Sequence, residues 1–219
     1  MLSLIFPPRC VLCHTFLRKN ETDLCHSCRA DAPETHNLKR SIPFIAKWTA
    51  LWYYRDNVRS SLHRFKFRNA RGYADVYARL LSRKLLESDF IDAIDMITWS
   101  PVSFQRKFRR GYDQTQLLAK ALSRELKIPL IKTMRKVRHT KKQSLIKDAS
   151  ERKANISGAY RIRNPKLVSG KQILLLDDIL TTGATASECA RILLTAGAKN
   201  VYFAAIATAN QDSPNKHRR

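Results

Sequence analysis

The segment that most constrains the fold is residues 173–185, ILLLDDILTTGAT. Four apolar residues suited to a buried strand are followed by two adjacent acids, a Thr- and Gly-rich turn and a helical pattern over 185–196. In open α/β sheets, ligands bind beyond the carboxyl ends of the strands, and a helix N-terminus offers free N–H groups to an anion. The segment therefore predicts an α/β fold with a phosphate-binding loop between a central strand and a helix.

Each residue type in this loop suits a sugar phosphate. Gly183 lets the backbone wrap closely around phosphate oxygens, and the carboxylates of Asp177 and Asp178 can accept hydrogen bonds from two sugar hydroxyls. The predicted phosphate-binding residues are Thr181, Thr182, Gly183, Ala184 and Thr185. A buried strand followed by an ordinary helix cap is the alternative, but it explains only part of the pattern.

The rest of the chain alternates between strand-like and helix-like patterns. Apolar or aromatic runs predict strands over 47–54, 94–99, 128–131, 173–176 and 201–207. Apolar residues at helical spacing predict helices over 56–67, 73–87, 114–126 and 185–196, and residues 104–111 and 135–150 are predicted to be loops. This order predicts an α/β fold with a mostly parallel sheet and helices on both faces.

Four of the five cysteines form two Cys-x-x-Cys pairs near the N-terminus, Cys10 with Cys13 and Cys25 with Cys28. Four thiolates suit tetrahedral zinc, and a closed set of four protein ligands is typical of a structural site. A redox dithiol is the alternative, although such pairs usually start a helix in a βαβ unit. The fifth, Cys189, is expected to be a small core residue.

The change in composition along the chain predicts its domain organisation. We expect a zinc-ribbon-like module over residues 1–40, a larger domain over 41–210 and a basic disordered tail over 211–219. No apolar run approaches the roughly 20 residues of a membrane span, and the N-terminal segment lacks a signal peptide's basic leader and cleavage site. A cytoplasmic protein is expected, with a peripheral contact at the inner face of the cytoplasmic membrane left open.

The formal net charge is +23, from 41 Lys and Arg against 18 Asp and Glu. Such a field favours polyanions, most commonly nucleic acid, although an anionic membrane or a generally basic proteome would also explain it. Three stretches, 63–68, 106–112 and 135–142, combine cations with aromatic or histidine rings, which favours single strands. The candidate contacts are Arg64, Lys66, Arg106, Lys107, Arg109, Arg110, Arg138, Lys141 and Lys142. The alternative is a solvated charged face with the aromatic rings in the core.

Taken together, these landmarks resemble the ComF (ComFC) family of competence proteins. The resemblance rests on the four-cysteine module, on residues 63–67 (HRFKF), 110–114 (RGYDQ), 143–144 with 151–155, and 158–160, and on the loop at 173–185. That loop resembles the 5-phosphoribosyl-1-pyrophosphate (PRPP) signature of type I phosphoribosyltransferases. The resemblance implies a type I phosphoribosyltransferase fold, in which Asp177 and Asp178 bind the ribose and residues 181–185 bind the 5′-phosphate. By the same resemblance, Pro101, Val102 and Ser103 form the pyrophosphate loop.

The resemblance also implies a role in natural transformation, in which DNA is handled as a single strand. We therefore expect a competence protein that binds single-stranded DNA through a basic surface and retains a PRPP pocket. Structural zinc is the expected cofactor, with Mg²⁺ where PRPP binds, and other DNA-uptake proteins are further candidate partners. The main alternative is an active phosphoribosyltransferase acting on a nucleobase or an amine. A PRPP-sensing regulator is less favoured, because no helix-turn-helix pattern precedes the domain.

Overall fold

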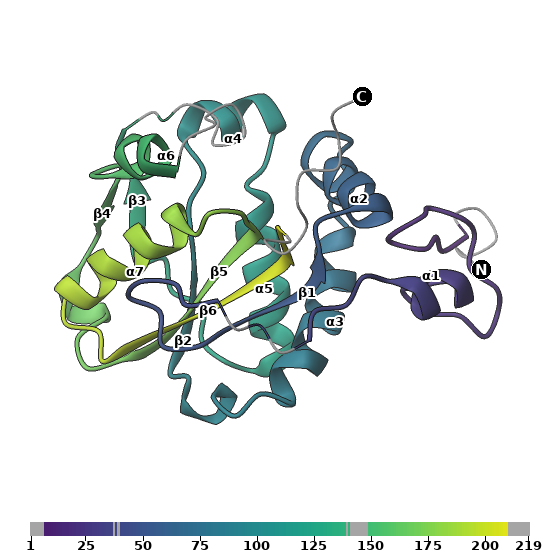
Figure 1. Ribbon diagram of the computed structural model, residues 1–219, viewed down its shortest axis with the longest axis horizontal. Helices are drawn as coiled ribbons and strands as arrows, with labels where there is room; N and C mark the ends of the chain where they lie inside the picture. The colour runs from purple at the N-terminus through teal and green to yellow at the C-terminus, as the bar shows by residue number, and fades with distance from the viewer. Residues whose placement is uncertain (1–6, 37, 39, 139, 141–148, 210–219) are drawn as a thin grey trace.

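A four-stranded sheet lies at the centre of the computed structural model, which describes residues 7–36, 38, 40–138, 140 and 149–209 (Figure 1). The strand order is β1-β6-β5-β2. These strands are β1 (Trp48–Tyr53), β2 (Met96–Trp99), β5 (Gln172–Leu180) and β6 (Asn200–Thr208), and each pair of neighbours is parallel. The predicted parallel sheet is confirmed.

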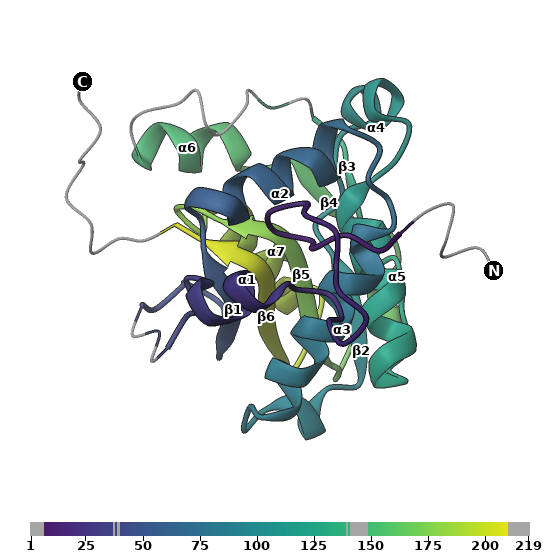
Figure 2. The same cartoon turned by 90° about the vertical axis from the view of Figure 1, so that its right-hand side faces the viewer.

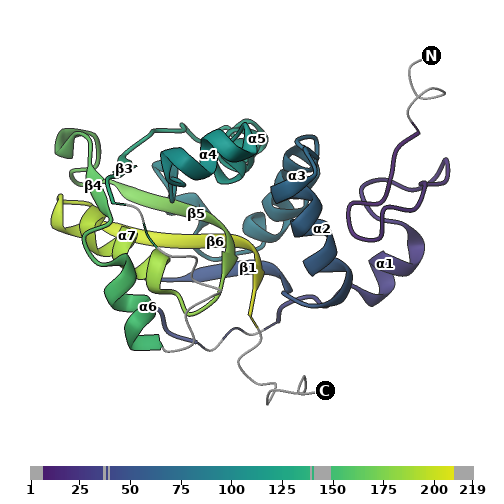
Figure 3. The same cartoon turned by 90° about the horizontal axis from the view of Figure 1, so that it is seen from above.

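Helices cover both faces of this sheet (Figure 3). The helices α2 (Asp56–Phe67), α3 (Tyr73–Leu86) and α5 (Gln114–Leu126) lie on one face, and α7 (Ala184–Thr195) lies on the other with α6 (Ala149–Ile156) beside it. In β5, Leu174 and Leu176 belong to the first apolar cluster, and Ile173 and Leu175 to the second. A parallel strand covered on both sides must be apolar on both sides, which explains the unbroken run in the sequence.

Two predicted elements differ from the structure. Residues 104–110, predicted to be a loop, form α4 (Phe104–Arg110), which Ser103 caps by accepting a hydrogen bond from the N–H of Arg106. Phe104 and Phe108 are its only apolar residues, and a single apolar pair among four basic residues is too short a pattern to indicate a helix. Residues 128–131 form no strand, and only Leu130 makes an isolated bridge, with Ile97.

The predicted loop over 135–150 is also only partly a loop. Its first residues belong to β3 (Met134–Lys136), which pairs antiparallel with β4 (Tyr160–Ile162), and α6 begins at its end. Residues 141–148 lie outside the described residues, and so does the predicted tail over 211–219. Among the described helices, none is long and apolar enough to cross a membrane.

The N-terminal segment over residues 7–32, which contains the short helix α1 (His26–Asp31), lies beside α2 and away from the sheet (Figures 1 and 3). Figure 2, which views the molecule from that side, shows the segment in front of α2 and the sheet. Its buried apolar residues belong to the same apolar cluster as those of α2, and this cluster includes Val11, Leu12 and Leu24 of the segment and Val58, Leu62 and Phe65 of the helix. The hydroxyl of Ser61 donates to the carbonyl of Val11, and the guanidinium of Arg64 donates to that of Leu12. The helix α2 therefore anchors the N-terminal segment to the sheet domain.

Candidate functional site

The four N-terminal cysteines come together in one cluster. The Sγ atoms of Cys10, Cys13, Cys25 and Cys28 all lie within 4.8 Å of one another, and those of Cys13 and Cys25 are 3.6 Å apart. Tetrahedral zinc with Zn–S bonds of about 2.3 Å places its sulfur ligands about 3.8 Å apart. One cluster of four thiolates therefore fits a structural zinc ion better than two separate redox pairs. Cys189 lies on α7 and is buried in the core, as expected.

The two acids of the sequence motif lie inside β5, because the strand continues to Leu180, four residues past its predicted end. Neighbouring residues of a strand point to opposite faces, so the two carboxylates have different surroundings. Asp178 accepts hydrogen bonds from Lys66 Nζ of α2 at 2.9 Å and from Gln114 Nε2 of α5 at 2.7 Å. The side chains of Lys66 and Asp178 are only 18% and 8% exposed, so this ion pair is buried between the helices and the strand.

Asp177 lines a small hollow together with the Thr- and Gly-rich turn. Burial, and then the adjacent carboxylate of Asp178, raise the pKa of Asp177 to about 7, although the Ser100 hydroxyl and the Asp178 N–H donate to it. Ser100 follows β2, which is the neighbour of β5 in the sheet. The predicted pyrophosphate loop, Pro101 to Ser103, therefore starts at the same edge of the sheet as the acids.

A buried acid holds that loop in place. The carboxylate of Asp113 accepts hydrogen bonds from the N–H of Val102 and from Trp99 Nε1, both at 3.3 Å. It also caps α5 by accepting from the N–H of Gln116 at 3.0 Å. Burial raises the pKa of Asp113. This one side chain therefore ties the loop after β2 to the helix that carries Gln114.

The turn after β5 is closed by an arginine. Gly183 has a φ of 81°, a left-handed conformation that favours glycine, and it directly precedes α7. The guanidinium of Arg40 donates to the carbonyl oxygens of Thr181, at 2.6 Å, and Thr182. The hollow at this turn measures about 20 Å³, which is room for a single water-sized group. A sugar phosphate would therefore fit only after the Arg40 side chain or the turn moved.

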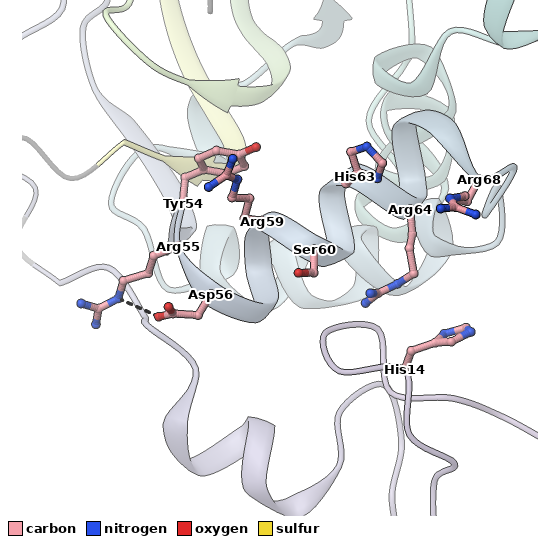
Figure 4. Close-up of a pocket in the computed structure, with 9 residues that line it drawn as sticks. All are labelled: His14, Tyr54, Arg55, Asp56, Arg59, Ser60, His63, Arg64 and Arg68. Atoms are coloured by element: carbon pink, nitrogen blue, oxygen red, sulfur yellow. Dashed lines mark ion pairs between the residues drawn. The ribbon is translucent and has the colours of Figure 1, made fainter. Parts of the chain in front are cut away.

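A much larger cleft, of about 1030 Å³, lies between the zinc module and α2 (Figure 4). Its lining residues are His14, Tyr54, Arg55, Asp56, Arg59, Ser60, His63, Arg64 and Arg68. Figure 4 shows Arg64 pointing down toward the module, whereas His63 points away from it. Among the described residues, the side chains of Arg59 and Arg68 make no hydrogen bond or ion pair. With four arginines and a single acid, the cleft is strongly attractive to an anion.

The predicted DNA contacts occupy very different environments. Four of them have partners within the protein. Arg64 donates to the carbonyls of Val11 and Leu12 in the zinc module, and Lys66 donates to Asp178. Arg138 donates to the carbonyls of Asn155 and Ser157, and Arg106 donates to the carbonyl of Thr140. Arg110 is half-buried and lies over the ring of Phe67, Lys107 and Arg109 are exposed on α4, and Lys141 and Lys142 lie outside the described residues. Of the aromatic rings in the same stretches, Phe65 and Tyr112 are buried, whereas Phe67 and Phe108 are exposed.

The sequence contained a signal for the cleft that the prediction did not use. Arg55, Arg59, His63 and Phe67 follow one another at intervals of four residues, the spacing that aligns side chains along one side of a helix. No comparable spacing pointed to Arg40, and the motif at 110–114, which contains Asp113 and Gln114, did not by itself indicate what these two side chains contact. Their contacts at the site depend on the tertiary fold: Arg40, for example, meets Thr181 across 141 residues of chain.

Comparison with known proteins identifies the class. Residues 116–218 match the family model of the phosphoribosyl transferase domain, and residues 1–38 match the double zinc ribbon domain. With the parallel sheet and the four-cysteine cluster, these matches define a protein with a type I phosphoribosyltransferase fold and an N-terminal zinc-ribbon module.

Within this class, the chain belongs to the ComF family of competence proteins, as its sequence motifs predicted. It is 30% identical over 200 residues to DNA utilization protein YhgH of Shigella flexneri, covering 88% of this chain and 86% of that protein. It is 27% identical over 223 residues to competence protein F of Haemophilus influenzae, covering 92% and 97% of the two chains. Competence protein ComFC of Bacillus subtilis is 26% identical over 201 residues, covering 86% and 78%.

Proposed function

We propose that this protein handles single-stranded DNA during natural transformation in the cytoplasm, and that the strand binds in the cleft between the zinc module and α2. The cleft carries the proposal, because Arg59 and Arg68 line it with guanidinium groups that have no partner among the described residues. The net charge of +23 adds long-range attraction for a polyanion. The names of the relatives, which refer to competence and DNA utilization, support the same role.

Aromatic rings beside the cleft favour a single strand over a duplex. Tyr54 lines the cleft, and the ring of Phe67, which is 48% exposed, lies 4.9 Å from the ring of His63 at its edge. Unpaired bases can stack on such rings, whereas the bases of a duplex already stack on one another. The zinc module supplies one wall of the cleft, which gives the structural zinc a direct role in shaping the DNA site.

Reversing the charge of the two free arginines tests this proposal. We expect Arg59→Glu with Arg68→Glu to weaken binding of a fluorescent single-stranded oligonucleotide by roughly tenfold or more, because phosphate contacts are lost. The slope of log affinity against log salt should become less negative by about 0.7 for each lost phosphate contact. Fluorescence anisotropy at several salt concentrations measures both quantities.

The matched control is Arg83→Glu, which reverses one exposed arginine of α3 that does not line the cleft. Its oligonucleotide affinity should fall only slightly, through the change in net charge. An equal loss per reversed charge in the control and the cleft variants would contradict the cleft site. A wild-type protein that binds no single-stranded DNA would contradict the function itself.

We also propose that PRPP binds at the loop after β5, with residues 181–185 on its 5′-phosphate, Asp177 and Asp178 on its ribose and Mg²⁺ on its pyrophosphate. Supporting this, the loops after β2 and β5 lie at one edge of the sheet, and Gly183 opens the turn at the start of α7. Arg40 would leave the carbonyls of the turn, and its guanidinium would then lie beside the phosphate. Lys66 would have to share or release Asp178 for that acid to meet the ribose.

The raised pKa of Asp177 predicts the pH dependence of stability. A buried acid with a pKa near 7 favours the neutral form in the folded protein, so its contribution to stability is present at low pH and is lost as pH rises through about 7. We therefore expect the protein, kept saturated with zinc, to lose stability as the pH rises from about 4, the pKa of an unfolded Asp, to about 7, and Asp177→Asn to lose less. Urea unfolding at each pH measures the difference, and parallel curves for the two proteins would refute it.

An active phosphoribosyltransferase is the second candidate function, favoured by the same meeting of the two loops at one edge of the sheet. Calorimetry with PRPP and Mg²⁺ tests binding, and release of pyrophosphate with nucleobase or amine acceptors tests turnover. Turnover that Asp177→Asn abolishes would favour the enzyme. Binding without turnover for every acceptor would favour a ligand that regulates the DNA-handling function.

A further inference from the structure

The helix α4 exposes two phenylalanine rings. Phe104 and Phe108, one helical turn apart, are 81% and 83% exposed, the highest values for large apolar side chains among the described residues. Their ring centroids are 6.5 Å apart and their planes differ by 26°, so the rings stack along the outside of the helix. Two large rings held together in solvent, on a helix with no buried residue, indicate a surface that meets a partner.

The charged residues around the two rings indicate that the partner is anionic. Four of the seven residues of α4 are basic, and none is acidic. Lys107 and Arg109 are exposed, and their side chains have no hydrogen bond or ion pair among the described residues. The surface therefore combines aromatic faces with free cations, which complement a chain that carries both flat rings and anionic groups.

The same surface is continuous with the basic cleft. The guanidinium of Arg110, at the end of α4, lies 4.8 Å from the ring centroid of Phe67 at the end of α2. The ring of Phe67 in turn contacts that of His63, which lines the cleft. The hydroxyl of Tyr112 donates to the carbonyl of Phe65, which fixes the chain after α4 against α2.

We propose that Phe104 and Phe108 form a platform on which unpaired bases of single-stranded nucleic acid stack, with Lys107 and Arg109 neutralising the adjoining phosphates. The inference rests on the proposed function and extends its path from the cleft, over Phe67, to α4. An anionic membrane would also attract rings and cations. However, helices that lie in a membrane surface present a wide apolar face, whereas only two of the seven residues of α4 are apolar.

Three double variants test the role of the rings. Changing Phe104 and Phe108 to Ala removes them, changing both to Leu keeps an apolar surface without an aromatic face, and changing both to Trp keeps the face. We expect the Ala and Leu variants to bind a single-stranded oligonucleotide about 5- to 150-fold more weakly for each stacked base lost, and the Trp variant to bind as the wild type does. With an abasic oligonucleotide, the wild type and the Ala variant should bind equally.

The oligonucleotide affinities of the wild type and the Ala variant separate the platform from the cleft. Wild-type binding of the oligonucleotide with no change in the Ala variant would overturn the platform and leave the cleft proposal standing. No binding by the wild type would overturn both. The platform would also be overturned, in favour of a lipid contact, by a different result: the wild type and the Leu variant bind phosphatidylglycerol vesicles, the Ala variant does not, and all three bind the oligonucleotide equally. Unaltered thermal unfolding and zinc content of the variants would show that the substitutions act on binding alone.

Discussion

Replacing Cys28 with Ser is expected to release the zinc ion and unfold the N-terminal module while the sheet domain stays folded. Binding of structural zinc contributes an apparent free energy of about 10–16 kcal/mol in small zinc modules, and that energy is also folding energy. Regular secondary structure contributes little to the module, because over residues 7–36 its helix is the six-residue α1. Metal analysis should show the loss of one zinc ion per chain, and hydrogen exchange should show loss of protection over residues 7–36.

The same substitution should also weaken binding of single-stranded DNA, because the cleft loses the wall that carries His14. The matched control is Cys189→Ala, which removes the fifth thiol, on the buried side of α7, and should leave the zinc content unchanged. A Cys28→Ser variant with a full zinc content and normal exchange protection would rule out a four-thiolate site. Loss of zinc in both variants would indicate general unfolding.

Replacing Asp178 with Ala is expected to destabilise the sheet domain by about 3–5 kcal/mol. The substitution leaves the ammonium group of Lys66 largely buried without its counter-charge, and an uncompensated buried charge lowers the free energy of unfolding by about this amount. It also leaves the amide of Gln114 without its acceptor. Urea unfolding monitored by circular dichroism measures the loss.

A double-mutant cycle separates the ion pair from other effects of the substitution. Combining Asp178→Ala with Lys66→Met removes both charges, so the double variant should recover a large part of the stability that the single change loses. The exposed pair of Arg124 and Asp75 provides the control, since Asp75→Ala should cost less than about 1 kcal/mol. Equal losses at the two pairs would contradict a buried role for Lys66 and Asp178.

Local sequence patterns predicted the elements that have one clear periodicity. The bounds of α2 and α5 agree with the predicted helices because apolar residues recur on one side of each, facing the same cluster. The unbroken apolar runs of β5 and β6 predicted buried parallel strands. The helix α4 was missed because Phe104 and Phe108 are its only apolar residues, and one such pair is too short a pattern to indicate a helix.

The length of β5 could not be predicted from its own residues. Two adjacent acids normally end a buried strand, because an unpaired buried charge is costly. Here the strand continues, because Lys66 and Gln114, from two different helices, satisfy Asp178. Arg40 meets the phosphate-binding turn in the same long-range way.

The sequence by itself determined the chemical components: four clustered thiols for zinc, a Thr- and Gly-rich turn between a strand and a helix, and a large excess of positive charge. Only the tertiary structure decided which of the cations can act on a partner. Lys66 and Arg64 have internal partners, whereas Arg59 and Lys107 have none among the described residues. The physical reason is that burial and pairing depend on contacts between distant parts of the chain, while charge and periodicity are local properties.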